Sequence, residues 1–370
     1  MSVQSVISSG VESQGKERCG MKPAYIVPTM REIDATQWNN RTVASLFSGC
    51  GGSSLGYKMS GFRVAYANEF IEAAAEIYRI NHSTTFVDTR DIREVKCGEV
   101  LDILNMKVGQ LDLLDGSPPC ASFSMAGLRE DGWNKVRKYS DSKQRSDDLF
   151  NQFARILKGL QPKMFVAENV AGLVHGKARG MFLEILAMLK QCGYKVRCKI
   201  LDAQWLGVPQ RRTRTIFIGI RNDLHGIPEH PKPLPYNYTV GDIFPNILDA
   251  TAEVECKDNS HALMPCLYKE WHNIAIGKHS ERYFQAYKLH PQKICPTIVA
   301  SVTQLSCLHP VQPRSLTISE LKKVCSFPAD FILTGPIMKQ HERLGRAVPP
   351  VMMSHIARTA QRQLQEMDQS

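Results

Sequence analysis

Short apolar runs alternate with longer amphipathic stretches between residues 43 and 220 of the chain. The short runs predict strands at residues 43–47, 62–66, 84–88, 111–114, 164–167, 195–201 and 215–220. The amphipathic stretches predict helices at residues 71–80, 149–160 and 178–192. Strands that alternate with helices are typical of a doubly wound α/β fold.

A glycine-rich turn follows the first predicted strand. Gly49, Gly51 and Gly52 leave room for a ligand to approach the backbone, and the helix expected after them offers unpaired N–H groups. Glu69 ends the second predicted strand, where a carboxylate can accept both hydroxyls of a ribose. The alternative for Glu69 is a solvated cap of the following helix. Together the turn and the acid indicate a Rossmann-like cofactor site.

Cys120 follows Pro118 and Pro119 directly after the fourth predicted strand. Two prolines cannot continue a sheet ladder, so they predict a fixed turn that holds the next side chain outward at the sheet edge. Such a position suits a nucleophile. A buried structural cysteine is the alternative in a chain with 11 cysteines.

More polar residues are expected at the same edge of the sheet. Glu168 and Asn169 follow the strand predicted at 164–167, and alternation places Arg212 and Arg214 on one face of an extended segment. Right-handed crossovers bring the carboxyl ends of parallel strands to one edge. The residues expected to converge there are Gly49, Glu69, Asp91, Cys120 and Glu168.

The domain organisation follows from where this alternation stops. Residues 1–40 lack periodicity and predict a flexible N-terminal arm, followed by the α/β domain at 41–221. Residues 222–335 open with a proline-rich stretch that has no long helical period, which predicts a smaller, irregular domain. Residues 336–370 are expected to form a C-terminal segment that returns to the α/β domain.

Charge and cysteine usage narrow the class of protein. The net charge of +10 favours a polyanionic partner, and the cationic segment 125–148, with Trp133 and Tyr139, is either a lid over nucleic acid or a solvated loop. The cysteines form no C-x-x-C pair, which predicts a reducing compartment and no metal site. No stretch approaches the roughly 18 apolar residues of a membrane span, and the polar start is unlike a signal peptide. We therefore expect a soluble protein that is not secreted.

Six motifs in unbroken order make the chain resemble the DNA cytosine-5 methyltransferase family over roughly residues 43–360. They are Leu-Phe-Ser-Gly-Cys-Gly-Gly at 46–52, Pro-Pro-Cys-Ala-Ser-Phe-Ser at 118–124, Glu-Asn-Val at 168–170, Gln-Arg-Arg-Thr-Arg at 210–214, Arg-Ser-Leu-Thr at 314–317 with Glu320 and Phe327-Pro328, and Gly-Arg-Ala-Val-Pro-Pro at 345–350.

The resemblance implies an enzyme that transfers a methyl group from S-adenosylmethionine to C5 of a flipped cytosine in a specific short double-stranded DNA sequence. Cys120 would form a covalent bond with C6 of the base. Glu168 would bridge or protonate N3, Arg214 would hold O2, and Arg212 would favour the Cys120 thiolate.

The resemblance also implies binding residues and partners. Contacts with S-adenosylmethionine would come from Phe47, Gly49, Gly51, Gly52, Glu69, Phe70, Asp91, Ile92, Pro118, Leu149 and Val348. Contacts with the DNA substrate would come from Asn169, Gln210 and Ser122, and residues 222–335 would hold the target recognition domain and the ninth motif. We expect a monomer in the cytoplasm of a bacterial or phage-infected cell, with a cognate restriction endonuclease in the same system.

Three positions depart from the pattern of the family. Ser45 stands where many relatives carry an acid, Ala121 where glutamine is usual, and Arg346 where asparagine is usual. The last change puts the cofactor contact of the final motif in question.

Three other functions stay open at this stage. A DNA-binding homologue without catalysis would not need Cys120 and Glu168, which the chain retains. A transfer RNA methyltransferase is the second alternative. The sizeable second domain favours DNA over transfer RNA as the substrate. A nicotinamide-dependent oxidoreductase explains neither the Pro-Pro-Cys turn nor the arginine pair.

Overall fold

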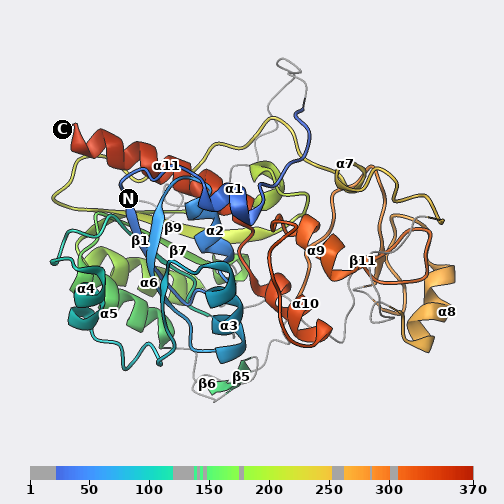
Figure 1. The fold of residues 1–370 in the computed structure, drawn as a ribbon, viewed down its shortest axis with the longest axis horizontal. Helices are drawn as coiled ribbons and strands as arrows, with labels where there is room; N and C mark the ends of the chain where they lie inside the picture. Colours follow the sequence, from blue (N-terminus) through green and yellow to red (C-terminus); the bar gives the residue numbers. More distant parts are fainter. Residues whose placement is uncertain are drawn as a thin grey trace.

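The computed structural model describes residues 22–119, 148–174, 179–251, 262–283, 286–300 and 307–369, together with the backbone of two short strands, β5 (Arg137–Tyr139) and β6 (Ser142–Gln144). Its centre is a seven-stranded sheet in the order β3-β2-β1-β4-β7-β9-β8 (Figure 1). The strands are β1 (Thr42–Leu46), β2 (Arg63–Asn68), β3 (Phe86–Asp88), β4 (Leu113–Gly116), β7 (Met164–Val170), β8 (Tyr194–Asp202) and β9 (Thr213–Arg221).

Each strand of this sheet overlaps one of the runs predicted from the sequence, and the α/β class is confirmed. The sheet is nevertheless mixed. β9 runs antiparallel to both β7 and β8, whereas the pairs β3-β2, β2-β1, β1-β4 and β4-β7 are parallel. The connection from β8 to β9 holds only a short 3-10 helix, Ala203–Leu206, and is too short for a crossover. The start of β9 therefore lies at the edge where β4 and β7 end.

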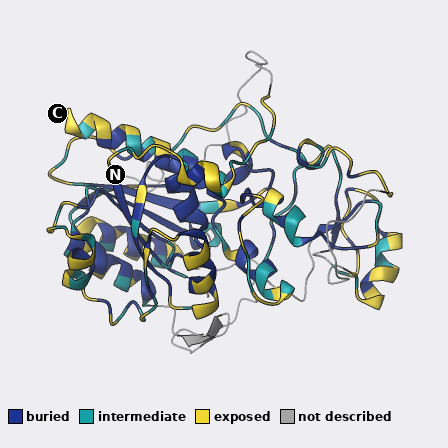
Figure 2. Cartoon of the chain, viewed as in Figure 1, coloured by how far each residue is buried: buried dark blue, intermediate teal, exposed yellow. Residues whose placement is uncertain are grey.

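Helices cover both faces of the sheet (Figure 1). On one face pack α4 (Cys97–Leu104), α5 (Leu149–Leu160) and α6 (Arg179–Gln191), whose buried side chains join one apolar core. On the other face pack α2 (Gly52–Lys58) and the C-terminal α11 (Pro350–Asp368), which contribute to a second core. α3 (Glu72–Asn81) follows β2. Figure 2 shows the strands buried between these layers, while the outer faces of the helices are exposed.

The described residues between 222 and 346 make up a second module, which includes α10 from the C-terminal segment that the sequence analysis begins at residue 336. Its elements are short: α7 (Val240–Ile243), α8 (Pro265–Asn273), β10 (Tyr287–Lys288), β11 (Cys307–Leu308), α9 (Ile318–Val324) and α10 (Ile337–Arg346). A third apolar core joins this module to the sheet domain, because Cys50, Leu55 and Ile77 pack in the same cluster as residues of α9. The module is thereby anchored beside the glycine-rich turn.

The prediction of a flexible arm is wrong for residues 22–40. Lys22 pairs with Asp242 at 2.6 Å, and the Tyr25 hydroxyl donates to the carbonyl of Lys323 at 3.0 Å. The short helix α1 (Met30–Asp34) buries Ile33 in the third core. These anchors are too irregularly spaced to give a periodic signal, so sequence patterning did not reveal them. Within the described ranges, no helix is long and apolar enough to cross a membrane.

Candidate active site

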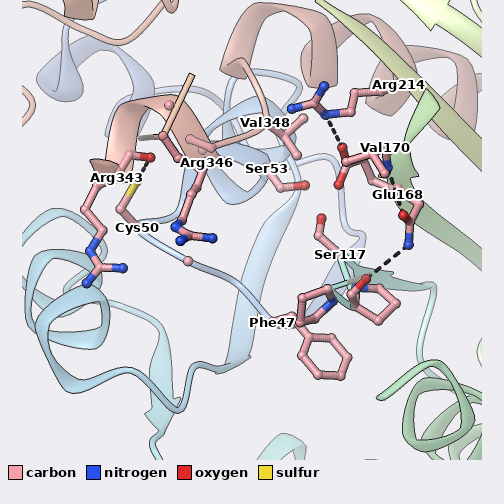
Figure 3. Close-up of a pocket in the computed structure, with 18 of the residues that line it drawn as sticks. Phe47, Cys50, Ser53, Ser117, Glu168, Val170, Arg214, Arg343, Arg346 and Val348 are labelled. Carbon is pink, nitrogen blue, oxygen red and sulfur yellow. Dashed lines mark hydrogen bonds and ion pairs between the residues drawn. The ribbon is translucent and has the colours of Figure 1, made fainter. Parts of the chain in front are cut away.

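A cavity of about 830 Å3 opens at the carboxyl edge of the parallel strands. Four of the five residues expected to converge here line it, namely Gly49, Glu69, Asp91 and Glu168. The fifth, Cys120, lies outside the described residues, as does Ser122, but Pro118 and Pro119 line the cavity. Figure 3 shows Cys50, Arg343 and Arg346 on one side of this cavity and Glu168 with Arg214 on the opposite side.

The glycine-rich turn depends on its glycines for two different reasons. Gly49 and Gly52 line the cavity, so their missing side chains leave space for a ligand. Gly51 lies outside the lining, which does not support the predicted cofactor contact. Its φ of 91° favours glycine, and a Cβ atom there would lie 2.1 Å from Nε2 of His82. Gly51 therefore lets the turn pack onto a buried histidine.

Glu69 anchors the glycine-rich turn through a hydrogen bond to its backbone. Its two carboxylate oxygens accept from the backbone N–H groups of Gly49 and Ile71, each at 2.7 Å. Burial raises the pKa of Glu69, and these two hydrogen bonds oppose that rise. The carboxylate is 8% exposed and lines the cavity, so it is placed to accept further hydrogen bonds from a ligand.

The apolar residues predicted to bind the cofactor line the same cavity as Glu69. They are Phe47, Phe70, Ile92, Pro118, Leu149 and Val348. The Phe70 ring is 41% exposed, which is unusual for a phenylalanine beside a core and suits a surface for stacking a planar group. Asp91, at the same end, forms an ion pair with Arg93 at 2.8 Å.

Glu168 and Arg214 form an ion pair on the opposite side of the cavity. Nε of Arg214 lies 2.6 Å from Oε1 of Glu168, and both side chains are largely buried. The antiparallel register of β7 and β9, which pairs Val170 with Arg214, brings the two residues together. The pair presents an acceptor and a cationic donor to the same ligand position.

Arg212 lines the cavity, as predicted, but its guanidinium is hydrogen-bonded to backbone carbonyls. It is 1% exposed and donates to the carbonyls of Ile298, Gly345 and Ala347 at 3.0, 2.8 and 2.9 Å. Burial, followed by the charge of Arg214, lowers the pKa of Arg212 to about 9. We therefore interpret Arg212 as a positioning residue, and the catalytic role expected from its sequence motif stays a prediction.

The two amide residues expected to contact DNA differ in position. Asn169 lines the cavity, and its Nδ2 donates to the carbonyl of Pro118 at 3.1 Å, which ties the Pro-Pro turn to β7. Gln210 is fully buried away from the cavity, and its amide oxygen accepts from the N–H of Ile298 at 3.3 Å. In this structure Gln210 joins the segment before β9 to the second module, and its contact with the DNA substrate stays a prediction.

Sequence patterning missed other residues of the cavity. Asp115 in β4 is 1% exposed, and burial raises its pKa to about 7. The sequence signal that could have identified Asp115 is an acidic residue directly after the apolar residues of β4. Arg343, which the sequence analysis did not name, also lines the cavity. So does Arg346, the departure in the final motif, whose Nε lies 2.9 Å from Oε1 of Glu342. No cluster of three metal-binding side chains occurs among the residues that the structure describes.

Comparisons with known proteins agree with this geometry. The family model for C-5 cytosine-specific DNA methylases matches residues 41–362. The type II methyltransferase M1.HphI of Haemophilus parahaemolyticus is 31% identical over 85% of each chain, and M.DdeI of Desulfomicrobium norvegicum is 28% identical over 85% of this chain and 87% of its own.

Solved structures share the fold. A prophage-encoded E. coli protein, assigned as a DNA modification methyltransferase, superposes with a TM-score of 0.68 at 21% identity, covering 90% of this chain and all of its own. DNMT2 of Spodoptera frugiperda gives a TM-score of 0.63 at 17% identity, covering 87% of this chain and 99% of its own. With the family model matched along most of its length, the chain belongs to the C-5 cytosine-specific DNA methylase family.

Proposed function

We propose that this DNA cytosine-5 methyltransferase transfers a methyl group from S-adenosylmethionine to C5 of a flipped cytosine in a specific short sequence of double-stranded DNA. The observation that carries the proposal is the double-ended cavity. Its glycine-turn end suits a nucleoside, and its other end holds the Glu168–Arg214 pair at 2.6 Å. The Pro118-Pro119 turn that leads to Cys120 lies in the wall of the same cavity.

The residues at the glycine-turn end fit S-adenosylmethionine. An ideal Cβ built on Gly49 meets nothing within 4 Å, so open space lies beside the turn. Glu69 suits the ribose hydroxyls, while Phe70 and Ile92 suit the adenine ring. When bound there, S-adenosylmethionine supplies the methyl group that C5 accepts.

The residues of the chain activate the base. In the proposed reaction the Cys120 thiolate adds to C6, and the electron pair of the C5–C6 double bond moves toward C5 and the N3–O2 side of the ring. Glu168 stabilises N3 by sharing a proton with it, and the guanidinium of Arg214 donates to O2. After C5 is methylated, a base removes the C5 proton, the C5–C6 double bond re-forms and the Cys120 thiolate leaves.

Access to the base requires flipping, because C5 and C6 of a stacked cytosine are out of reach of a thiol. Segment 125–148, proposed as the lid, lies mostly outside the described residues. We further propose that the enzyme acts as a monomer in the cytoplasm of a bacterial or phage-infected cell, beside a cognate restriction endonuclease. The type II names of its relatives support that setting.

A covalent-adduct experiment tests the proposal. The full chain is incubated with S-adenosylmethionine and duplex DNA in which 5-fluorocytosine replaces cytosine, so that the C5 substituent cannot leave as a proton. A denaturation-resistant adduct is expected, to be lost in Cys120→Ser and kept in Cys97→Ser, the matched control on α4. Absence of an adduct with the wild-type chain would overturn the mechanism. Methyl incorporation into transfer RNA but not into duplex DNA would replace DNA with RNA as the substrate.

A further inference from the structure

The cavity wall contains a buried carboxylate that the proposed chemistry does not use. Asp115 of β4 is 1% exposed and lines the cavity. Its Oδ2 accepts from the Ser45 hydroxyl at 3.0 Å and its Oδ1 from the Tyr57 hydroxyl at 3.2 Å. Both donors are neutral, and Asp115 takes part in none of the ion pairs formed by the described residues. A buried carboxylate without a cation is costly, which favours a functional reason for its presence.

The position of Asp115 explains one departure of this chain from its family. Ser45 stands where many relatives carry an acid, and the parallel register of β1 and β4 places Ser45 opposite Asp115. Their side chains meet just before the glycine-rich turn on one strand and the Pro-Pro turn on the other. In this chain the acid of this part of the cavity wall is Asp115, on the strand that neighbours Ser45.

Small polar side chains lie beside Asp115 in the cavity wall. Ser53, from α2, is 6% exposed and lines the cavity, and its hydroxyl lowers the pKa of Asp115. Figure 3 shows Ser53 and Ser117 in the middle of the cavity, between its cofactor end and Glu168. Glu168 adds negative charge near Asp115, although its own charge is paired with Arg214.

We propose that Asp115, held by Ser45 and Tyr57, makes the cavity prefer the positively charged sulfonium of the methyl donor over the neutral thioether left after transfer. This inference rests on the proposed function. A carboxylate of low solvent exposure attracts a sulfonium strongly and a thioether hardly at all. The attraction therefore disappears with the methyl group, which favours release of S-adenosylhomocysteine.

Calorimetric titration of the full chain with S-adenosylmethionine and, separately, S-adenosylhomocysteine tests this preference without turnover. In Asp115→Asn the affinity for S-adenosylmethionine is expected to fall about tenfold more than that for S-adenosylhomocysteine, the equivalent of one weak ion pair. The titrations are made at about pH 9, where Asp115 is ionised. Ser45→Ala is the matched control there, because it removes a hydrogen bond but keeps the charge, and it should change both affinities by a similar factor. The exchange variant Ser45→Asp with Asp115→Ser should restore the preference.

Two other outcomes distinguish failure of the proposed function from failure of the role proposed for Asp115. If the wild-type chain binds neither compound, the proposed function itself fails. If it binds both and Asp115→Asn weakens both equally, Asp115 is a structural residue and the inference is overturned.

A measurement on the wild type alone tests the inference even if the Asp115 variant does not fold. The affinity ratio of the two compounds should fall as the pH is lowered from about 8 to about 5, because Asp115 becomes protonated. The titratable groups facing it are Tyr57 of α2, Tyr78 of α3 and Glu168 of β7. The two tyrosines stay neutral throughout this range, since burial raises their pKa values. A ratio that does not change with pH would also overturn the inference.

Discussion

Replacing Arg212 with methionine should destabilise the protein strongly, although the hydrogen-bond partners of Arg212 are neutral backbone carbonyls. The guanidinium is 1% exposed and joins β9 to two distant segments through the carbonyls of Ile298, Gly345 and Ala347. Methionine fills a similar space but donates no hydrogen bond. Three buried carbonyls would each lose a donor, at about 1 to 3 kcal/mol each. Allowing for non-additivity, we expect a loss of about 3 to 6 kcal/mol.

Thermal denaturation followed by circular dichroism measures this loss, which corresponds to a fall in melting temperature of about 4 to 8 °C for a chain of this size. Arg212→Lys should be intermediate, because one ammonium group cannot reach acceptors on both segments. Arg211→Met is the matched control, since Arg211 is exposed and the change should cost no more than about 0.5 kcal/mol. An Arg212→Met protein that melts within about 1 °C of the wild type would refute the positioning role.

Three further predictions concern the cavity. Gly51→Ala should lower the melting temperature, because its Cβ would collide with His82, and an unchanged melting temperature would contradict the packing argument. Glu168→Gln should slow methyl incorporation into duplex DNA about 100-fold or more, whereas a rate within a few fold of wild type would exclude proton transfer by Glu168. Burial raises the pKa of Asp115 to about 7, so the native state binds the extra proton and loses stability as the pH rises from about 4 to 7. In the ligand-free chain, the melting temperature of Asp115→Asn relative to that of the wild type should therefore rise from about pH 4 to about pH 7. A difference that stays constant with pH would contradict the raised pKa of Asp115.

The sequence predicted the α/β domain well because its signals are local. The helix predicted at 149–160 is α5 (Leu149–Leu160), whose apolar positions recur at helical spacing and which ends before Pro162. The convergence of Gly49, Glu69 and Glu168 followed from strand order and crossover handedness alone. These inferences need no knowledge of which side chains finally touch.

The errors arose where distant segments decide the outcome. The sequence analysis left the direction of β9 open, because that direction depends on a connection too short for a crossover, which alternation along one strand does not report. Gln210 reads as a polar residue of a functional motif, but it is buried against Cys325 and Ile298 of the second module. Residues 22–40 read as polar and aperiodic, but Tyr25 and Ile33 pack onto that same module.

The sequence by itself determined the fold class, the glycine-rich turn, the position of the candidate nucleophile in the chain and the kind of reaction its motifs resemble. Those properties reside in local periodicity and in residue types at short spacing. Only the tertiary structure decided what each polar side chain does with its hydrogen bonds. It committed Arg212 to three carbonyls, paired Arg214 with Glu168, and placed Asp115 against Ser45 across a strand boundary. The physical reason is that the chemistry of a buried polar group depends on its neighbours in space, which a linear pattern does not contain.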